Sequence, residues 1–215
     1  MEFSRRDLLR GTAAGAVLAH LPALARAETR APRKLHVDTH QIDVFGKPTT
    51  RYGVFQADGT YGLSLNEGDV FDADLANGLT APTLVHWHGF VEPWRQDGVP
   101  NLSSPPIPAG KSRRFTFPAK PAGTRWMHSH FGLQEQNLLA APFIVREASA
   151  IRADVQEVVA MFEDFSRRPP DEIFAALRQA RISMGKEAAK APDLNDVDYD
   201  AFLANGRTPD APEVV

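Results

Sequence analysis

Two histidine pairs, each with one residue between its members, are the feature that most constrains the fold of this chain. The strings His86-Trp87-His88 and His128-Ser129-His130 contain four of the seven histidines. Side chains at positions i and i+2 share a face when the backbone is extended, so each string predicts a β-strand carrying two adjacent imidazoles. One such pair would by itself favour an exposed strand face or a pair of hydrogen-bonded core histidines. Two pairs on neighbouring strands predict four nitrogen ligands around one small volume.

These four histidines are therefore the predicted metal ligands of the chain. Imidazole suits copper, zinc, iron and nickel, so the ligand type alone leaves the metal open among these four. Alternation along residues 83–88 predicts that His86 and His88 lie on one face of their strand. Trp87 then lies on the other face, and we interpret Trp87, Trp126 and Met127 as packing residues.

Short strand-like runs separated by turn signals continue over residues 34–148. The expected strands cover residues 35–44, 61–65, 70–75, 83–88, 112–117, 124–130 and 141–145. A long loop rich in proline and glycine covers residues 89–110. Many short strands with such spacing are typical of an all-β sandwich or barrel.

The sequence changes in character beyond residue 148. The apolar run 155–162 is expected to open a second sheet. A helix is expected after Pro169-Pro170, with Asp171 as its cap and Gly185 as its end. Its apolar face would carry Ile173, Phe174 and Leu177. Residues 186–196 are expected to form a polar loop.

Composition excludes several classes of function. The apolar fraction of 43% is sufficient for a core, and the net charge of −3 gives no electrostatic reason for binding nucleic acid or an anionic membrane. The sequence contains no cysteine. Disulfides, cysteine-ligated zinc and iron–sulfur clusters are therefore excluded, as is a blue-copper centre, which needs a thiolate.

The N-terminus reads as an export signal over residues 1–27. A twin-arginine pair, Arg5-Arg6, precedes a modestly apolar stretch that is too short to span a bilayer. Ala25-Arg26-Ala27 then forms a small-residue cleavage site. The alternative is a chance arginine pair in a cytosolic protein, but the order of the three features favours a periplasmic protein without a membrane span.

The histidine strings and their flanks resemble the first two copper motifs of the multicopper oxidases. The matching segments are 77–79, 86–89, 97–100, 126–130 and 132–136. The resemblance covers residues 34–148 well and implies a cupredoxin-like Greek-key β-sandwich there. Residues 149–215 would be the incomplete start of a second cupredoxin domain containing the short helix, with 198–206 as its entry.

The resemblance also implies a copper cofactor and a role for each histidine. His86 would bind the type 2 copper of a trinuclear cluster, and His88, His128 and His130 would bind the type 3 pair. Family members take four more histidines from a C-terminal cupredoxin domain, and they hold a type 1 copper through a cysteine. This chain has neither, so we expect the N-terminal part of an exported oxidase that is inactive by itself. The complete enzyme would couple one-electron oxidation of a small molecule or metal ion to reduction of O2 to water.

Asp97 is the candidate catalytic residue, in the run Asp97-Gly98-Val99-Pro100. An aspartate before glycine is also a common turn signal, and this reading stays open. The matching aspartate in related enzymes lies near the type 2 copper and relays protons. Glu135 and Gln136 are weaker candidates for supporting the copper ligands.

Two alternatives to this interpretation also stay open. His36 and His40 flank Asp38 on one face of a predicted strand and could chelate a metal, although a solvated strand face is the simpler reading. The chain could also be a non-catalytic periplasmic copper-binding or copper-tolerance protein. Methionine-rich tracts would favour that function, and the chain has only four methionines.

Overall fold

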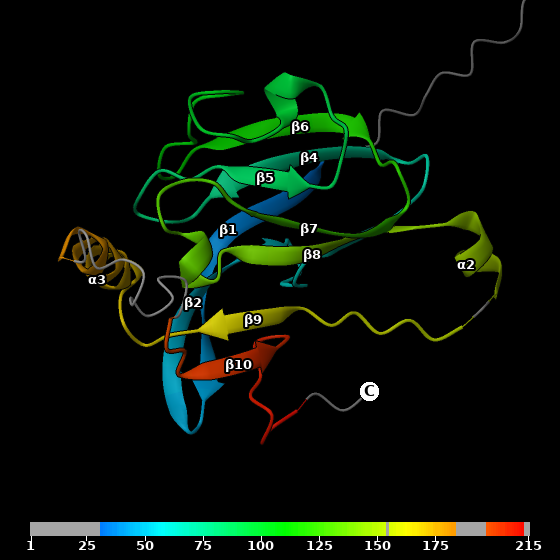
Figure 1. Ribbon diagram of the computed structural model, residues 1–215. Helices are drawn as coiled ribbons and strands as arrows, with labels where there is room; N and C mark the ends of the chain where they lie inside the picture. The colour runs from blue at the N-terminus through cyan, green and yellow to red at the C-terminus, as the bar shows by residue number, and fades with distance from the viewer. Residues whose placement is uncertain (1–30, 154, 184–196, 213–215) are drawn as a thin grey trace, which may run out of the picture. The chain divides into compact units, whose positions relative to one another are not determined.

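Two four-stranded sheets carry most of the described structure (Figure 1). The computed structural model divides the chain into Met1–Ala31 and Pro32–Val215, and it describes residues 31–153, 155–183 and 197–212. The expected export signal at 1–27, the helix end at Gly185 and the polar loop 186–196 lie outside the described residues. No described helix is both long enough and apolar enough to cross a bilayer.

The first sheet has the order β2-β1-β4-β6, and the second has the order β3-β8-β7-β5. The strands of the first sheet are β1 (Arg33–Val44), β2 (Lys47–Gln56), β4 (Val70–Asn77) and β6 (Ser112–Pro118). Those of the second are β3 (Leu63–Asn66), β5 (Val85–His88), β7 (Gly123–Ser129) and β8 (Ala140–Arg146). Neighbouring strands are antiparallel except for β1–β4 and β3–β8, which are parallel. Crossovers of this kind bring strands that are distant in sequence into one sheet.

The expected β-sandwich is confirmed, and each of its seven expected strands is present with ends shifted by a few residues. The strand β2 was not expected. Its first half, Lys47 to Thr50, has no regular alternation of large apolar residues, so the period-two signal is weak. The turn at Phe45-Gly46, where both φ angles are positive, folds β2 back onto β1 as a hairpin.

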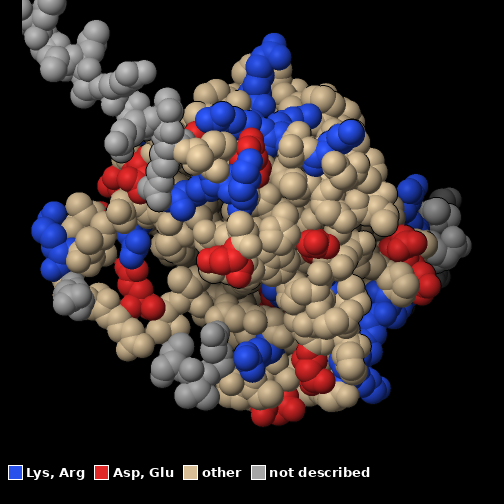
Figure 2. Space-filling view, turned by 180° about the vertical axis from the view of Figure 1, so that it is seen from behind, with Lys and Arg blue, Asp and Glu red and all other residues tan. Residues whose placement is uncertain are grey.

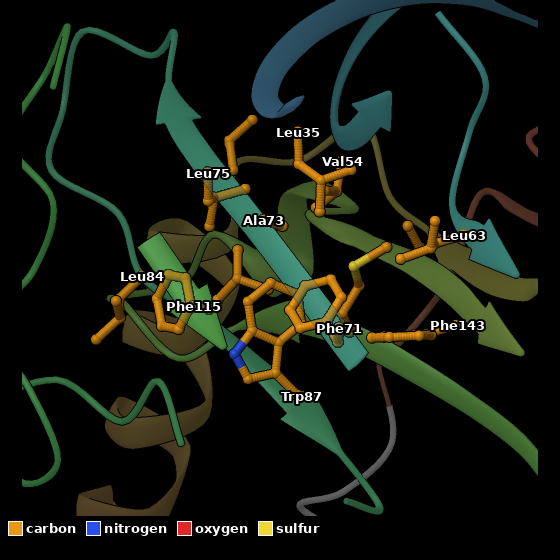
Figure 3. Packing of buried hydrophobic residues seen from close by; sticks show 14 of the residues in the cluster. Leu35, Val54, Leu63, Phe71, Ala73, Leu75, Leu84, Trp87, Phe115 and Phe143 are labelled. Carbon is orange, nitrogen blue, oxygen red and sulfur yellow. The ribbon is translucent and has the colours of Figure 1, made fainter. Parts of the chain in front are cut away.

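The core lies between the sheets and is rich in aromatic rings (Figure 3). Trp87 is fully buried and packs against Phe71 and Phe115, with ring centroids 4.8 and 5.1 Å apart respectively. Val85, the other inward residue of β5, is also fully buried. Since the pleat alternates, the burial of Trp87 directs His86 and His88 to the opposite face of the sheet.

The region beyond residue 148 differs from the expectation in three respects. A short helix, α2 (Ala148–Ala153), was not expected. No strand forms over 155–161, and the strand β9 is confined to Phe162–Phe165, where it pairs with β10 (Ala201–Ala204). Val155 and Val158 are instead exposed, because no strand lies beside them among the described residues. The helix α3 (Pro170–Ser183) is present, with Asp171 in its first turn instead of at its cap.

A buried polar network joins the two-stranded sheet β9–β10 to the sandwich. Nη1 of Arg51 on β2 lies 2.6 Å from Oε2 of Glu163 on β9, and their side chains are only 3% and 4% exposed. The Tyr61 hydroxyl donates to the carbonyl of Ala140 at 2.8 Å and lies 3.4 Å from Oε1 of Glu163. A small apolar cluster, containing Val44, Leu138, Phe165, Ala201 and Leu203, packs in the same region.

The charged side chains on the face that Figure 2 shows are of both signs. Lysine and arginine are interspersed with aspartate and glutamate over the face that Figure 2 shows, in keeping with the small net charge.

Candidate metal centre

Strand pairing brings the two histidine pairs together. Strands β5 and β7 are antiparallel neighbours, and His86 lies directly opposite His128 in their register. The backbone N–H of His130 donates to the carbonyl of Leu84 at 3.1 Å, which continues the pairing past the end of β7. The four imidazoles form one cluster, with centroid distances from 4.8 Å for His86–His130 to 5.6 Å for His86–His88.

The ring nitrogens face one another or a carboxylate. Nδ1 of His88 lies 3.3 Å from Nε2 of His128. Nδ1 of His86 lies 2.8 Å from the backbone carbonyl of Asp97 and 3.1 Å from its Oδ1. These contacts hold Nδ1 of His86 and leave its Nε2 for another partner. One potential ligand atom from each of His86, His88 and His128 falls within a mutual distance of 4.8 Å.

The electrostatics of the cluster favour the neutral form of two of its imidazoles, His128 and His130. Burial lowers the pKa of His128 to about 4, with further lowering by the neighbouring His130, His86 and His88. Burial is also the main cause of the lowered pKa of His130. Nδ1 of His128 is buried and has no hydrogen-bond partner. A neutral imidazole has a lone pair that a soft or borderline metal ion can bind. Such an ion would also give the buried Nδ1 of His128 the partner that it lacks.

The residues expected to pack around the cluster differ in their contacts. Trp87 and Met127 lie in the sandwich core. Trp126 instead stacks on the His128 ring, with a centroid distance of 4.1 Å and an interplanar angle of 12°. Oε2 of Glu135 lies 3.1 Å from Nδ1 of His128, without hydrogen-bond geometry. Gln136 lines a neighbouring cavity.

Two polar residues near the cluster were not predicted from the sequence. Oε1 of Gln134 accepts hydrogen bonds from the hydroxyls of Thr83 at 2.7 Å and Ser129 at 2.9 Å, which ties the segment before β5 to the end of β7. Glu92 lies beside Asp97, and burial followed by the Asp97 side chain raises its pKa to about 7. Glu92 could have been proposed as a site residue because it is an acidic residue only four positions after His88. Nothing in the sequence indicated a role for Gln134.

A glycine conformation places Asp97 against His86. Asp97 follows the 3-10 helix η1 (Trp94–Gln96), and Gly98 has φ of +79°. A Cβ atom on Gly98 would overlap the backbone carbonyl of Val85 in β5. The loop therefore approaches the histidine strand closely only because residue 98 is glycine.

We expect Gly98→Ala to displace this loop and to destabilise the fold by more than 1 kcal/mol, roughly, since both the positive φ and the overlap act against alanine. Gly110→Ala is the matched control, because Gly110 also has a positive φ of +67° but a Cβ atom on it would meet no other atom within 4 Å. Urea unfolding of the two variants measures the difference. Equal losses of stability would show that the contact with β5 is unimportant.

The remaining strand histidines lie elsewhere. His36 and His40 on β1 pack against Phe55, with centroid distances of 5.7 and 4.8 Å. Nε2 of His40 accepts a hydrogen bond from Nε of Arg51 at 3.0 Å, and burial followed by the Arg51 charge lowers the pKa of His40 to about 4. His40 is thus half-buried and partnered, so the solvated strand face expected for it is not what forms. Neither histidine belongs to a group of potential metal ligands among the described residues.

The two-sheet sandwich, with imidazoles clustered on the outer face of one sheet, is a cupredoxin-like domain of the kind found in copper oxidases. Residues 56–150 match the family model described as multicopper oxidase. Residues 56–150 are therefore a multicopper oxidase domain, in agreement with the resemblance noted in the sequence.

Named relatives support the same family. Copper resistance protein A of Escherichia coli is 36% identical over 119 residues, which is 54% of this chain and 20% of that protein. Copper resistance protein A of Pseudomonas syringae pv. tomato is 30% identical over 190 residues, or 82% of this chain and 31% of that protein. The chain therefore spans about a third or less of the length of these relatives.

Solved structures agree on the fold. A laccase from Botrytis aclada has a TM-score of 0.59 and 28% identity, covering 80% of this chain and 30% of its own. A laccase-like multi-copper oxidase from Ochrobactrum sp. has a TM-score of 0.62 at 20% identity, covering 81% of this chain and 39% of its own, which supports the fold alone.

Proposed function

We propose that this chain supplies half of the ligand set of a trinuclear copper cluster in a multicopper oxidase. His86 would hold the type 2 copper, and His88, His128 and His130 would hold the type 3 pair. The observation that carries the proposal is the convergence of four imidazoles on β5 and the end of β7. The orphaned Nδ1 of His128 and the neutral rings fit copper chemistry.

Within this function, Asp97 would both orient His86 and hold a proton near the cluster. Its backbone carbonyl and Oδ1 orient the His86 ring, and its carboxylate lies where it can hold a proton beside the cluster. Copper held by these residues would pass electrons from the reducing substrate to O2, and the reduction of O2 to water would consume protons as well. Glu92, beside Asp97 and half-buried, lies in the same group, since one potential ligand atom from each of His86, Glu92 and Asp97 falls within 4.8 Å of the others. A role of Asp97 in the turn is therefore compatible with a catalytic role.

The proposal includes partners outside this sequence. Four imidazoles are half of the family's cluster, and the remaining four would come from a C-terminal cupredoxin domain. Residues 149–215 would then be the first part of a second cupredoxin domain, represented here by β9, β10 and α3. The reducing small-molecule or metal-ion substrate would bind to the complete enzyme, and this chain alone would not turn over.

Copper titration of the purified chain tests this proposal. We expect copper to bind without an intense blue colour, because no cysteine is present to form a copper–thiolate bond. Absorption and electron paramagnetic resonance spectra of the copper-loaded chain give the measurement. An intense blue band, or no copper retained after dialysis, would contradict the proposed site.

A non-catalytic copper-binding or copper-tolerance protein is the second candidate function. The relatives named copper resistance protein A favour it, since their names state resistance and not turnover. Oxygen uptake distinguishes the two candidates. A full-length protein containing this chain would consume O2 with a reducing substrate if it is an oxidase, and it would bind copper without O2 uptake if it is a tolerance factor.

We also propose export to the periplasm by the twin-arginine route. Changing Arg5 and Arg6 to lysine should leave unprocessed precursor in the cytoplasm, because the route reads the arginine pair itself. Immunoblots of cell fractions measure the outcome. Normal periplasmic accumulation of the double variant would rule out this route.

A further inference from the structure

The closest ring contact in the metal centre is made by a residue that cannot bind metal. The Trp126 indole lies nearly parallel to the His128 imidazole, with a centroid distance of 4.1 Å and an angle of 12°. The same indole lies 5.1 Å from the His88 ring on the neighbouring strand. Trp126 therefore touches one candidate ligand from each of the two strands.

Strand geometry explains these contacts. Trp126 and His128 are two residues apart on β7, so their side chains share a face. His88 lies directly opposite Trp126 in the register of β5 and β7. Because β7 has a neighbour on each side, the position of the indole is fixed by backbone pairing with both β5 and β8.

The Trp126 indole also borders a cavity. A cavity of about 440 Å³ is lined by Trp126 and Glu135, together with apolar residues that include Met161, Phe162 and Phe174. Glu135 also reaches His128, with Oε2 at 3.1 Å from Nδ1. Trp126 and Glu135 thus contact the His128 ring and also line this cavity, which His128 itself does not line. If the indole were removed, the ring would lose its stacking partner and gain room to rotate.

We propose that Trp126 is a positioning residue that fixes the plane of the His128 imidazole for metal binding, with Glu135 restricting the ring at its Nδ1 edge. The inference rests on the proposed copper site. Stacking holds the ring plane without using a ring nitrogen, so it does not compete with a metal ion for the imidazole lone pair. Partners that orient a metal-ligating histidine typically contribute about 10- to 100-fold to metal affinity.

Copper affinity of single variants tests the role. In chelator-competition titrations of the full chain with Cu²⁺, Trp126→Leu should weaken binding about 10-fold. Trp126→Phe should stay within about twofold of wild type, because the phenyl ring keeps a stacking face. Trp94→Phe is the control, since Trp94 is 59% exposed on η1. Glu135→Gln, a milder change at a half-exposed side chain, should weaken binding less than Trp126→Leu does.

Indole fluorescence reports whether Trp126 lies beside the bound copper. Cu²⁺ should quench the emission of the wild-type chain, and most of this quenching should disappear in Trp126→Phe but remain in Trp94→Phe. Equal quenching in all three proteins would overturn the proposal, as would unchanged affinity in a folded Trp126→Leu. Equal losses of copper affinity in Trp126→Phe and Trp126→Leu would contradict the positioning role and show that Trp126 only packs.

A metal-free measurement separates this inference from the copper site itself. The stacked indole should shift the ring-proton NMR signals of His128 upfield in the wild-type chain, and Trp126→Leu should abolish the shift. This test also stands if Trp126→Leu folds poorly, since the wild-type shift needs no variant. Absence of the shift would overturn the positioning role. A shift without any copper binding would instead refute the proposed copper site and leave the stacking intact.

Discussion

His128→Ala should remove most of the copper bound by this chain. His128 is the most enclosed imidazole of the cluster, it contacts His88 through facing nitrogens 3.3 Å apart, and its ring centroid lies 4.9 Å from that of His130. Since the loss of an orienting partner alone costs about 10- to 100-fold in affinity, the loss of a ligand should cost at least roughly 100-fold. Copper competition titration at neutral pH measures the change.

His36→Ala is the matched control for this variant. His36 is also a partly buried strand histidine in contact with an aromatic ring, Phe55, but it lies on β1 and outside the cluster. Copper binding should be unchanged in this control, whereas His86→Ala should resemble His128→Ala. Equal losses in all three variants would mean that copper binds histidines indiscriminately, and the case for a preformed site would fail.

Arg51→Met should be the most destabilising single change outside the core. It leaves the Glu163 carboxylate, only 4% exposed, without its partner at 2.6 Å. Breaking a buried ion pair from one side typically costs about 3–5 kcal/mol. Arg114→Met is the control, because the Arg114–Asp72 pair at 2.7 Å is largely exposed, with side chains 56% and 24% accessible. Exposed pairs contribute about 1 kcal/mol or less.

The pH dependence of Arg51→Met follows from Glu163. Burial raises the pKa of Glu163, and the Arg51 charge opposes this rise. Without Arg51 the pKa of the folded state rises further above that of the unfolded chain, so the folded state binds the proton more tightly. Stability must then fall as the pH increases above the ordinary glutamate range. Urea unfolding should therefore show a larger deficit at about pH 8 than at about pH 5; a deficit independent of pH would contradict this account.

Local periodicity predicted the sandwich but not all of its parts. The strands with large apolar residues at alternate positions, such as β4 and β6, were expected because their pattern reflects one buried face. Strand β2 was missed because Arg51 and Gly53 occupy buried positions that an apolar pattern would fill. The burial of Arg51 depends on Glu163, which lies 112 residues away in sequence. A pairing between residues so far apart in sequence depends on tertiary structure, so a short sequence segment cannot reveal it.

The same distinction holds for the candidate site. The i, i+2 spacing placed each histidine pair on one face, and the structure brings the two pairs together. The partners of these rings are non-local: Asp97 reaches His86 through the Gly98 turn, and Glu135 reaches His128 through the 3-10 helix η2 (Glu135–Asn137). Trp126 was expected only to pack, since a sequence cannot show which ring an indole will stack on.

The sheet order gives the two halves of the histidine cluster unequal freedom. Strand β5 is short, lies at the edge of its sheet and pairs only with β7 among the described strands, whereas β7 is bonded on both sides. Backbone amides at an edge open at lower free energy than those of an interior strand, so β5 should exchange its amide hydrogens sooner than β7. We therefore expect the backbone of β5, which carries His86 and His88, to yield more readily to an arriving ion than the backbone of β7, which carries His128. The centre thus combines ligands on a rigid interior strand, β7, with ligands on a more flexible edge strand, β5. Copper binding should slow amide hydrogen exchange mainly in β5.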